Sequence, residues 1–473
     1  MFLEKIVAQA KNDLAERKRE LSLVEVQRLA AAQPAPRDLY AALRQGSNIK
    51  LVAEVKRASP SKGLLAPQLD PVEVARTYES HGAAAISVLT EPHFFLGSPA
   101  YLTAIKRAVR VPVLRKDFIF DEYQVYEARA WGADALLLIC AILDDIQLRH
   151  LLDIARSLHM HCLVEVHSAE EAQRAVAAGA QIIGVNSRDL ATFKMNPHLI
   201  RELRPLIPTD RLVVAESGIH TQADARRLAR YDVQAMLVGE SLVVSRDISA
   251  QMRSLLQGAN ESAQVKICGI RSPEHAQVAI DAGADMLGLI FYEPSHRYIH
   301  PQSARMLVES IQHEHTTADV VGVFVNCEAD FINDIAEQVG LQFVQLHGDE
   351  TPEFCQRIKR PVIKALSLNS PDDISRARAY DETSWRILLD TPTAQWGGTG
   401  EMHDWTLARS VAQAMPILLA GGLTPENVAE AIHQVHPWGV DVSSCVETNR
   451  VKDVEKIRAF IDKVRDCDSS HQF

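Results

Sequence analysis

Short, continuous apolar runs alternate with amphipathic helical patterns along almost the whole chain. Runs of this kind, rather than a strict alternation of apolar and polar residues, are typical of parallel strands buried on both faces. In the first half we predict strands at 51–56, 84–89, 112–116, 135–140, 162–166, 182–186, 212–216 and 235–238. In the second half we predict strands at 265–267, 286–290, 320–325, 343–346, 361–365, 387–390, 416–419 and 439–442.

The second half of the chain repeats the rhythm of the first. Gly82-Ala83 precedes one apolar run, and Gly283-Ala284 precedes another. Residues 213–219 are echoed in the same way by residues 417–423. The offset stays near about 200 residues, the lower size of one (β/α)₈ barrel. We therefore predict an α/β protein made of two tandem (β/α)₈ TIM barrels.

The first 47 residues precede the first predicted strand. Their apolar residues recur three or four positions apart, which predicts an amphipathic helix. The polar stretch 257–263 has the composition of a linker. We thus predict a first barrel over 1–258 with a helical extension over 1–47, a linker over 259–263, and a second barrel over 264–473.

Composition narrows the class of protein. The chain has 47% hydrophobic and 23% charged residues and a net charge of −11, which argues against a general nucleic-acid binder. Its seven cysteines are scattered and form no C-x-x-C pair, as expected of reduced thiols in the cytoplasm. The charged first 20 residues do not resemble a signal peptide, and the longest apolar run is too short to span a bilayer. We expect a cytoplasmic protein that binds neither nucleic acid nor membrane.

Ionisable residues gather at the predicted strand ends of the first half, where (β/α)₈ barrels carry their reactive groups. Glu54 and Lys56 are two apart on one strand and therefore share a face. The ends of four later strands carry Lys116, Glu165, Asn186 and Glu216. Any one of these residues alone is more simply a structural ion pair. Two lysines and three carboxylates at one mouth instead indicate acid–base catalysis.

Two glycine turns follow the last two strands of the first half, Ser217-Gly218 and Gly239-Glu240-Ser241. Barrels of this type hold phosphate with the backbone amides of these loops. We therefore predict that Ser217, Gly218, Gly239 and Glu240 contact a phosphate group.

In the second half, Cys268 and Asp390 end the first and sixth strands and could serve as a thiolate base and a carboxylic acid. A lone cysteine is more often a small buried hydrophobe, but its place at a strand end followed by glycine favours function. Lys266, on the same strand face as Cys268, is expected to lower the pKa of the thiol. Candidate phosphate contacts come from three turns and are Gly398, Thr399, Gly400, Gly421, Gly422, Ser443 and Ser444.

The first half resembles indole-3-glycerol-phosphate synthase. The resemblance covers most of residues 1–258 and is carried by residues 54–63 (EVKRASPSKG), 114–118 (LRKDF), 163–167 (LVEVH) and 215–219 (AESGI). It implies a barrel with extra N-terminal helices. It also implies that Lys116 is the general acid that activates a ketone oxygen, and that Glu165 assists later proton transfer.

The same resemblance assigns the remaining residues of this site. Glu54 and Lys56 would form a pair beside the substrate, which Asn186 and Glu216 would orient. The aromatic pocket would be lined by Ser59, Phe118 and one of Phe94 and Phe95. Glu240 departs from the serine often found in this phosphate loop. Its side chain is expected to turn away, so that the backbone amide binds the phosphate.

The second half resembles phosphoribosylanthranilate isomerase over nearly all of residues 264–465. The motifs are residues 265–270 (VKICGI), 345–350 (QLHGDE), 389–391 (LDT), 396–400 (WGGTG) and 440–444 (VDVSS). The resemblance implies that Cys268 is the base and Asp390 the acid of an Amadori rearrangement. Arg297 would bind the anthranilate carboxylate, and His347 would form a wall of the pocket. His296 and Cys445 depart from the usual proline and small residue.

The two resemblances fit one pathway, because the product of the isomerase is the substrate of the synthase. We interpret the chain as a bifunctional enzyme of tryptophan biosynthesis, and we expect a monomer that acts on small phosphosugar–anthranilate substrates. On this residue set neither step needs a redox cofactor or a metal. The alternatives are that one barrel has decayed into a phosphosugar-binding domain, or that the chain is an unrelated epimerase or aldolase, with Lys116 or Lys364 forming a Schiff base.

Overall fold

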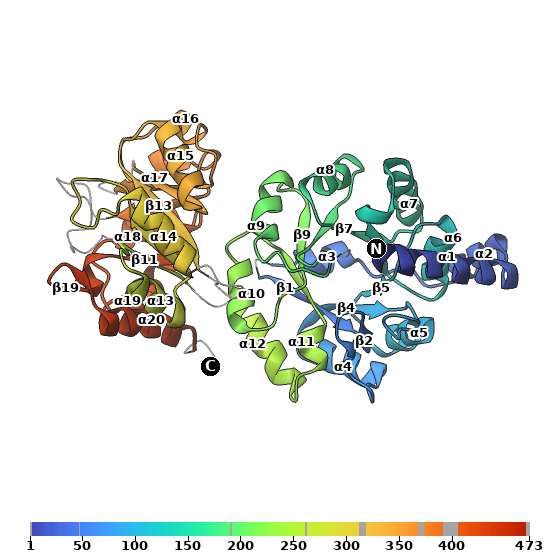
Figure 1. Cartoon of the computed structure of the whole chain (residues 1–473). Helices are drawn as coiled ribbons and strands as arrows, with labels where there is room; N and C mark the ends of the chain where they lie inside the picture. Colours follow the sequence, from blue (N-terminus) through green and yellow to red (C-terminus); the bar gives the residue numbers. More distant parts are fainter. Residues whose placement is uncertain are drawn as a thin grey trace. The chain divides into compact units, whose positions relative to one another are not determined.

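The computed structural model describes residues 2–46, 48–189, 192–260, 263–311, 318–367, 373–390 and 405–469. The chain divides into two compact units, Met1–Asn260 and Glu261–Phe473. Among the described residues, each unit contains a closed barrel of eight parallel strands surrounded by helices (Figure 1). This confirms the predicted fold of two tandem (β/α)₈ barrels.

The first barrel closes by the parallel pairing of its first strand with both its second and its last strand. Its strands are β1 (Lys50–Val55), β4 (Ala83–Leu89), β5 (Val113–Lys116), β6 (Ala135–Ile139), β7 (His161–Val166), β8 (Ile182–Asn186), β9 (Leu212–Glu216) and β10 (Ala235–Val238). Its helices are α4 (Pro71–Ser80), α5 (Pro99–Ala108), α6 (Glu122–Ala130), α7 (Asp145–Ser157), α8 (Ala169–Ala177), α9 (Leu199–Leu203), α10 (Gln222–Leu228), α11 (Glu240–Val243) and α12 (Ile248–Asn260). A short hairpin of β2 (Ala58–Ser59) and β3 (Gly63–Leu64) follows β1.

The second barrel closes in the same way, its first strand pairing with its second and its last. Its strands are β11 (Gln264–Cys268), β12 (Met286–Ile290), β13 (Asp319–Phe324), β14 (Phe343–Leu346), β15 (Val362–Ser367), β16 (Arg386–Asp390), β17 (Ile417–Leu419) and β18 (Gly439–Val442). Its helices are α13 (Pro273–Asp281), α14 (Pro301–Ile311), α15 (Ala329–Val339), α16 (Pro352–Cys355), α17 (Asp373–Arg378), α18 (Trp405–Ala412), α19 (Val428–Val435) and α20 (Val454–Ser469). A hairpin of β19 (Glu447–Thr448) and β20 (Val451–Lys452) lies between β18 and α20.

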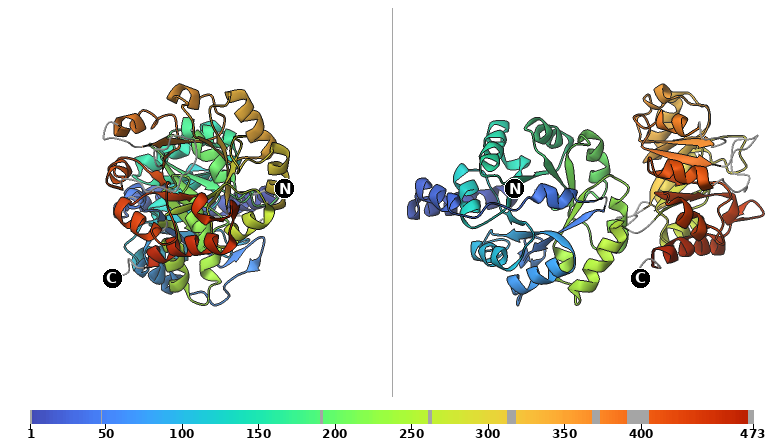
Figure 2. Two further views of the ribbon diagram at one scale, coloured as in Figure 1. Left: turned by 90° about the vertical axis from the view of Figure 1, so that its left-hand side faces the viewer. Right: turned by 180° about the vertical axis from the view of Figure 1, so that it is seen from behind.

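The continuous apolar runs are the barrel strands, as the sequence predicted. Every residue of β6 and of β16 is buried, because one face points into the barrel and the other is covered by helices (Figure 2). The repeated glycines precede the second strand of each barrel. Gly82 has a φ of 92° and Gly283 a φ of 97°. This left-handed conformation turns the chain from helix into strand, and a side chain would be strained there.

The N-terminal extension forms three helices, α1 (Phe2–Glu20), α2 (Leu23–Ala31) and α3 (Leu39–Arg44), and α2 packs against α6 (Figure 1). Arg17 of α1 donates to Glu127 of α6 at 2.7 Å. At the start of α1, the ring of Phe2 lies 5.4 Å from that of Phe94 and 5.1 Å from that of Phe193, centroid to centroid. The extension therefore contacts two loops of the first barrel.

The first residues of the polar stretch that was predicted to be a linker are helical, so the prediction is wrong for them. Residues 257–260 form the last turn of α12. The side-chain oxygen of Asn260 accepts from the Ile49 amide at 2.6 Å, and its nitrogen donates to the Ile49 carbonyl at 3.1 Å. These bonds attach the end of α12 to the residue before β1, so the polar side chain serves the first barrel.

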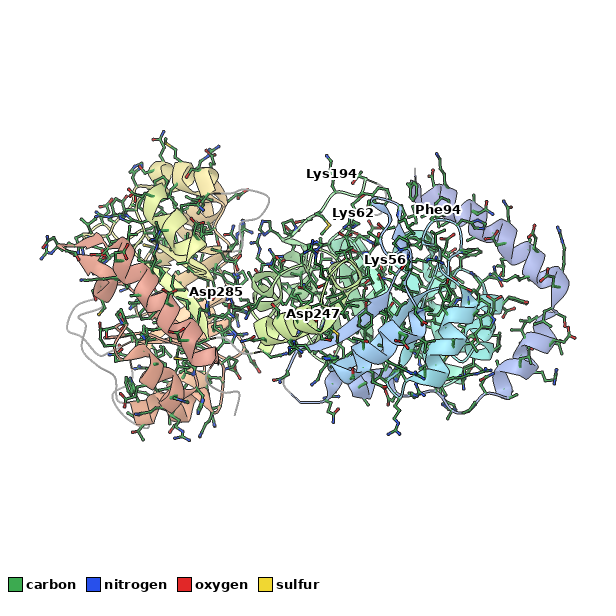
Figure 3. The ribbon with its side chains drawn as sticks, turned by 90° about the horizontal axis from the view of Figure 1, so that it is seen from below. Lys56, Lys62, Phe94, Lys194, Asp247 and Asp285 are labelled. Atoms are coloured by element: carbon green, nitrogen blue, oxygen red, sulfur yellow. The ribbon has the colours of Figure 1, made fainter. Side chains whose placement is uncertain are left out.

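The last helix of the second barrel is attached by a comparable polar contact. Arg465 of α20 donates to Asp285 at 2.7 Å, and Asp285 (labelled in Figure 3) also accepts from the Val265 amide at 2.8 Å. In the part of the chain that the structure describes, no helix combines the length and the apolar character that crossing a membrane requires.

Candidate active sites

Lys116 lies at the centre of the charged cluster in the first barrel. It ends β5, and its Nζ donates to Glu165 Oε2 at 2.9 Å and to Glu216 Oε2 at 2.6 Å. Burial lowers the pKa of this lysine, but the two carboxylates outweigh burial and raise the pKa above its usual value. Lys116 therefore carries its proton at neutral pH and is held where it can donate it.

The two carboxylates around Lys116 differ in their readiness to hold a proton. Burial favours the neutral form of both. At Glu165 the charges of Lys116 and His167 overcome burial and lower the pKa. At Glu216 burial, together with the charge of Glu165, outweighs Lys116 and raises the pKa. The cluster thus contains one ionised carboxylate beside one that retains a proton more readily, an arrangement suited to moving protons.

Glu54 and Lys56 form the expected pair on β1 and just after it. Lys56 Nζ lies 3.0 Å from Glu54 Oε1, and Ser87 on the adjacent strand donates to Glu54 Oε2 at 3.4 Å. The glutamate is 4% exposed. A buried carboxylate requires such partners, since an unpaired charge is costly inside a protein. The pair stands beside the Lys116 cluster in the same cavity.

Almost all the predicted residues of the first half line one cavity in the barrel mouth. They are Glu54, Lys56, Ser59, Phe95, Lys116, Phe118, Glu165, Asn186, Glu216, Ser217, Gly218, Gly239 and Glu240. Phe94 is the exception, so Phe95 is the one of the two phenylalanines left open above that lines this cavity. The Phe94 ring packs on Phe2, whereas Phe95 lines the cavity with its ring 6.2 Å from that of Phe118.

Glu240 is a lining residue of the cavity, and its side chain is paired with a lysine. Its Oε1 lies 2.5 Å from Nζ of Lys62, which extends from the β2–β3 hairpin (Figure 3). Burial raises the pKa of Glu240, but its bond to Lys62 and the charge of that lysine lower it overall. The negative charge in the phosphate loop is therefore balanced by a neighbouring lysine.

The sequence did not point to Arg188 and Phe193, which belong to the first cavity, or to His167, which contacts Glu165. Arg188 and Phe193 line the cavity. The His167 ring lies between two carboxylates, with Nε2 3.3 Å from Glu165 Oε1 and Nδ1 3.3 Å from Glu171 Oε2. Burial lowers its pKa, but the two carboxylates raise it to about 10. The spacing of Glu165 and His167, two residues apart on one strand face, was the available signal.

In the second barrel, Cys268 and Asp390 line one cavity as predicted. The other predicted residues there are Arg297, His347, Gly421, Gly422, Ser443 and Ser444. Cys445 and His296, the two departures from the resembled family, line it as well. The predicted residues Gly398, Thr399 and Gly400 lie outside the described residues.

Lys266 acts on Cys268 in the predicted direction and lowers the pKa of the thiol, but the net pKa is raised. Burial disfavours the thiolate, and this outweighs the charges of Lys266 and Lys452. Lys266 Nζ lies 3.0 Å from Asp441 Oδ1, and that carboxylate opposes the effect of the lysine on the thiol. The resting enzyme therefore holds Cys268 mainly as a neutral thiol.

Asp390 contacts His347, with 3.3 Å between Asp390 Oδ2 and the imidazole Nε2. The other ring nitrogen, Nδ1, lies 2.9 Å from Nε2 of Gln345. Lys364, offered above as a possible Schiff-base lysine, is buried and donates to the carbonyls of Leu346 and Gly348 at 3.2 and 2.6 Å. Its bonds fix the backbone on both sides of His347.

A glycine on the neighbouring strand makes room for one catalytic candidate in each barrel. At Gly184 on β8, a β-carbon would overlap Glu216 Oε1. At Gly288 on β12, it would lie 2.7 Å from Cys268 Sγ. Neither glycine has a positive φ. Both positions therefore require glycine for space rather than for backbone conformation.

Comparison with known families separates the chain into the same two halves. The family model of indole-3-glycerol phosphate synthase matches residues 3–255, and that of N-(5'-phosphoribosyl)anthranilate isomerase matches residues 265–463. The chain belongs to the bifunctional synthase–isomerase family. Hereafter the first barrel is the synthase barrel and the second is the isomerase barrel.

Individual proteins are similar to the whole chain or to one of its halves. The chain is 37% identical to the multifunctional tryptophan biosynthesis protein of Phycomyces blakesleeanus, over 98% of this chain and 69% of that protein. It is 38% identical to the tryptophan biosynthesis protein TrpCF of Yersinia pestis, over 91% of this chain and 87% of that protein. The crystal structure of phosphoribosyl anthranilate isomerase from Thermotoga maritima is 42% identical over 43% of this chain and 99% of that chain, with a TM-score of 0.41.

The chain is therefore a bifunctional enzyme of tryptophan biosynthesis. Its isomerase barrel converts N-(5-phosphoribosyl)anthranilate to 1-(2-carboxyphenylamino)-1-deoxyribulose 5-phosphate. Its synthase barrel decarboxylates, cyclises and dehydrates that product to indole-3-glycerol phosphate. The alternative of a decayed barrel finds no support.

Proposed function

We propose that Cys268 and Asp390 are the base and the acid of the isomerase barrel. An Amadori rearrangement turns an aminoaldose into an aminoketose. It needs a proton delivered to the sugar ring oxygen and a proton removed from C2. Cys268 and Asp390 line the same cavity from strands β11 and β16, which supports their acting on one substrate from two sides. Asp390 donates the first proton and the Cys268 thiolate removes the second.

In the synthase barrel, Lys116 protonates the ketone oxygen of the substrate as the aromatic ring attacks the ketone carbon. Carbon dioxide then leaves, and loss of water completes the indole ring. Glu165 serves this later dehydration, and Glu216 and Asn186 orient the substrate. The support for this assignment is the position of Lys116, charged and bonded to both Glu165 and Glu216.

Phosphate binding is assigned to the turns that follow the last strands of each barrel. Ser217 and Gly218 have consecutive positive φ values of 66° and 73°, and Gly421 and Gly422 have values of 80° and 65°. Successive turns of this kind direct backbone amides toward one point, which favours an anion. Arg297 is assigned to the anthranilate carboxylate, because an arginine fork matches the two oxygens of a carboxylate.

The observation that supports these roles is that Lys116, Glu165 and Glu216 line one cavity, and Cys268 and Asp390 line the other. Product analysis tests them. Given N-(5-phosphoribosyl)anthranilate, the unaltered enzyme should form indole-3-glycerol phosphate. Lys116→Ala should stop at the ribulose phosphate, and Cys268→Ser should convert that intermediate but not the first substrate. If Cys268→Ser still formed indole-3-glycerol phosphate from the first substrate, the thiol would not be the base.

The proposal also covers the localisation of the protein, its oligomeric state and the class of ligand that it binds. We infer a cytoplasmic monomer that handles small phosphosugar–anthranilate substrates and binds no nucleic acid. The net charge of −11 supports the last point, since a nucleic-acid surface is usually basic. Light scattering at several protein concentrations would test the monomer, and a dimer mass at all of them would contradict it.

A further inference from the structure

We propose that the β19–β20 hairpin positions Arg297, through Glu447 and Lys452, so that the isomerase barrel selects substrates that carry a carboxylate. The inference rests on the proposed role of Arg297 in binding the anthranilate carboxylate. Glu447 and Lys452 are positioning residues in this scheme, and neither needs to touch the substrate.

Glu447 holds one edge of the Arg297 guanidinium. Arg297 Nε donates to Glu447 Oε1 at 2.7 Å, and Nη2 donates to Oε2 at 3.0 Å. The side chains are 10% and 7% exposed. A paired, shielded contact of this geometry is stronger and more directional than a surface ion pair. It fixes the plane of the guanidinium as well as its position.

The other edge of the guanidinium is left for a ligand. Arg297 lines the cavity that contains Cys268 and Asp390. Glu447 does not line that cavity and instead borders a separate hollow beside Arg450 and Lys452. Among the described residues, Nη1 of Arg297 makes no hydrogen bond. Because Glu447 approaches from behind, it can hold the arginine without competing with a substrate carboxylate.

Lys452 connects this contact to the rest of the site. Its Nζ donates to Glu447 Oε1 at 2.8 Å and to the Ser443 carbonyl at 2.7 Å. The Ser443 hydroxyl in turn donates to the Cys268 carbonyl at 3.2 Å. One buried lysine therefore joins the arginine anchor to the predicted phosphate turn and, through Ser443, to the backbone of the base.

The side chain of Arg297 packs directly against the backbone of Gly269. A β-carbon at this position would lie 2.6 Å from Cδ of Arg297 and 3.4 Å from Nζ of Lys452. The aliphatic part of Arg297 thus crosses directly over the residue that follows Cys268. Glu447 on one side and Gly269 below confine Arg297, and this confinement lowers the entropy that binding must remove.

The test uses two substrates, N-(5-phosphoribosyl)anthranilate and its carboxylate-free analogue N-(5-phosphoribosyl)aniline. The discrimination factor is the ratio of their isomerase kcat/KM values. Glu447→Gln replaces the charged two-oxygen acceptor by a neutral amide with one acceptor oxygen. We expect the discrimination factor to fall about tenfold, as expected for a bond to a charged group, chiefly through KM. Lys452→Met should lower it by a smaller factor.

Three controls separate the possible causes. Glu455→Gln changes an exposed glutamate of α20 and should leave the discrimination factor unchanged. Synthase activity in the same chain reports the amount of intact enzyme. Glu447→Asp keeps the charge and should retain more discrimination than Glu447→Gln. If Glu447→Gln unfolds the isomerase barrel, the Asp variant and Lys452→Met still test the role of the hairpin.

Arg297→Met separates failure of this inference from failure of the proposed role of Arg297. If Arg297→Met leaves the discrimination factor unchanged, Arg297 does not bind the carboxylate and both fail. If Arg297→Met abolishes discrimination while Glu447→Gln and Lys452→Met preserve it, only the inference about the hairpin is overturned. A fall in kcat/KM by the same factor for both substrates in Glu447→Gln would likewise overturn it, because that result indicates a general structural role.

Discussion

The two barrels share a topology, but their cavities are built on opposite electrostatic principles. In the synthase cavity, Lys116 touches two carboxylates, and the resulting ion pairs keep it protonated. In the isomerase cavity, Cys268 is buried so deeply that its neutral form is favoured despite two nearby lysines. The synthase site therefore holds its proposed acid in the charged form, whereas the isomerase site holds its proposed base in the neutral form.

The difference shows that residues at equivalent strand ends of the same fold can have opposite protonation states. Charges on several strands stabilise one another only if their side chains meet, as Lys116, Glu165 and Glu216 do. At a single thiol, desolvation can outweigh the charges of nearby lysines, as it does at Cys268. The fold therefore fixes where reactive groups lie, while the neighbours of each group decide its protonation.

The largest expected effect comes from removing Lys116, the cation that Glu165 and Glu216 share in the synthase site. Lys116→Ala deletes the proposed acid and leaves two buried carboxylates facing each other. We expect synthase kcat/KM to fall about 10²- to 10⁴-fold, with isomerase activity unchanged. Lys5→Ala, an exposed lysine of α1, is the control. Synthase activity of Lys116→Ala within a few-fold of the unaltered enzyme would contradict the assignment.

The matching change in the isomerase is Cys268→Ser, whose hydroxyl is far less acidic than a thiol. Isomerase kcat/KM should fall by a similar factor, about 10²- to 10⁴-fold, while the synthase is unaffected. Cys467→Ser in α20 is the control for an indirect effect of replacing a cysteine. If both serine variants isomerise at the normal rate, Cys268 is a packing residue and another group is the base.

The pH profiles should separate the sites by a smaller factor. Because the pKa of Cys268 is raised, the thiolate fraction of free enzyme grows with pH below that pKa. Isomerase kcat/KM should rise about tenfold per pH unit from about pH 6 to about pH 8. Lys116 and Glu165, with raised and lowered pKa values, stay charged over this range. Glu216, whose pKa is raised to about 8, changes charge there, but it only orients the substrate in our scheme, so the synthase profile should be flatter. Parallel profiles in one preparation would show that the comparison is wrong.

The smallest expected effect concerns His167, which adds a positive charge next to Glu165. His167→Asn removes that charge, so the pKa of Glu165 should rise and more of it should be protonated as the pH falls. We expect about tenfold lower synthase kcat, with the larger loss on the acidic side. His161→Asn is a matched control, because His161 begins the same strand and pairs with Asp38 at 3.0 Å. Equal losses in the two variants would indicate that only packing had changed.

The barrels were predictable because their strands are continuous apolar runs at a regular spacing, which few other folds produce. The strand-end residues followed from the same pattern, since every barrel strand delivers its last side chains to one mouth. Lys116 and Cys268 could be located this way. The sequence could not predict which of Phe94 and Phe95 lines the cavity. Phe94 packs instead on Phe2, which comes from a distant part of the chain.

The protonation states of the site residues also could not be predicted from the sequence. Lys266 is two residues from Cys268, and the spacing correctly placed both on one face. It could not reveal that Asp441, on the neighbouring strand β18, opposes the effect of that lysine on the thiol. In the same way, Arg297 was identified as a carboxylate ligand, but Glu447 lies 150 residues away and carries no motif of its own. Long-range partners of this kind become visible only in three dimensions.

Gly184 and Gly288 have a consequence for anyone who mutagenises this enzyme at random. Neither residue has chemistry to offer, and each is needed only because a neighbouring strand's reactive side chain occupies the volume a methyl group would fill. In a selection for growth without tryptophan, alanine at either position should be depleted almost as strongly as replacements of Glu216 and Cys268 themselves. A mutational scan would therefore mark two inert residues as essential, and an enzyme designer should keep both fixed while varying the loops around them.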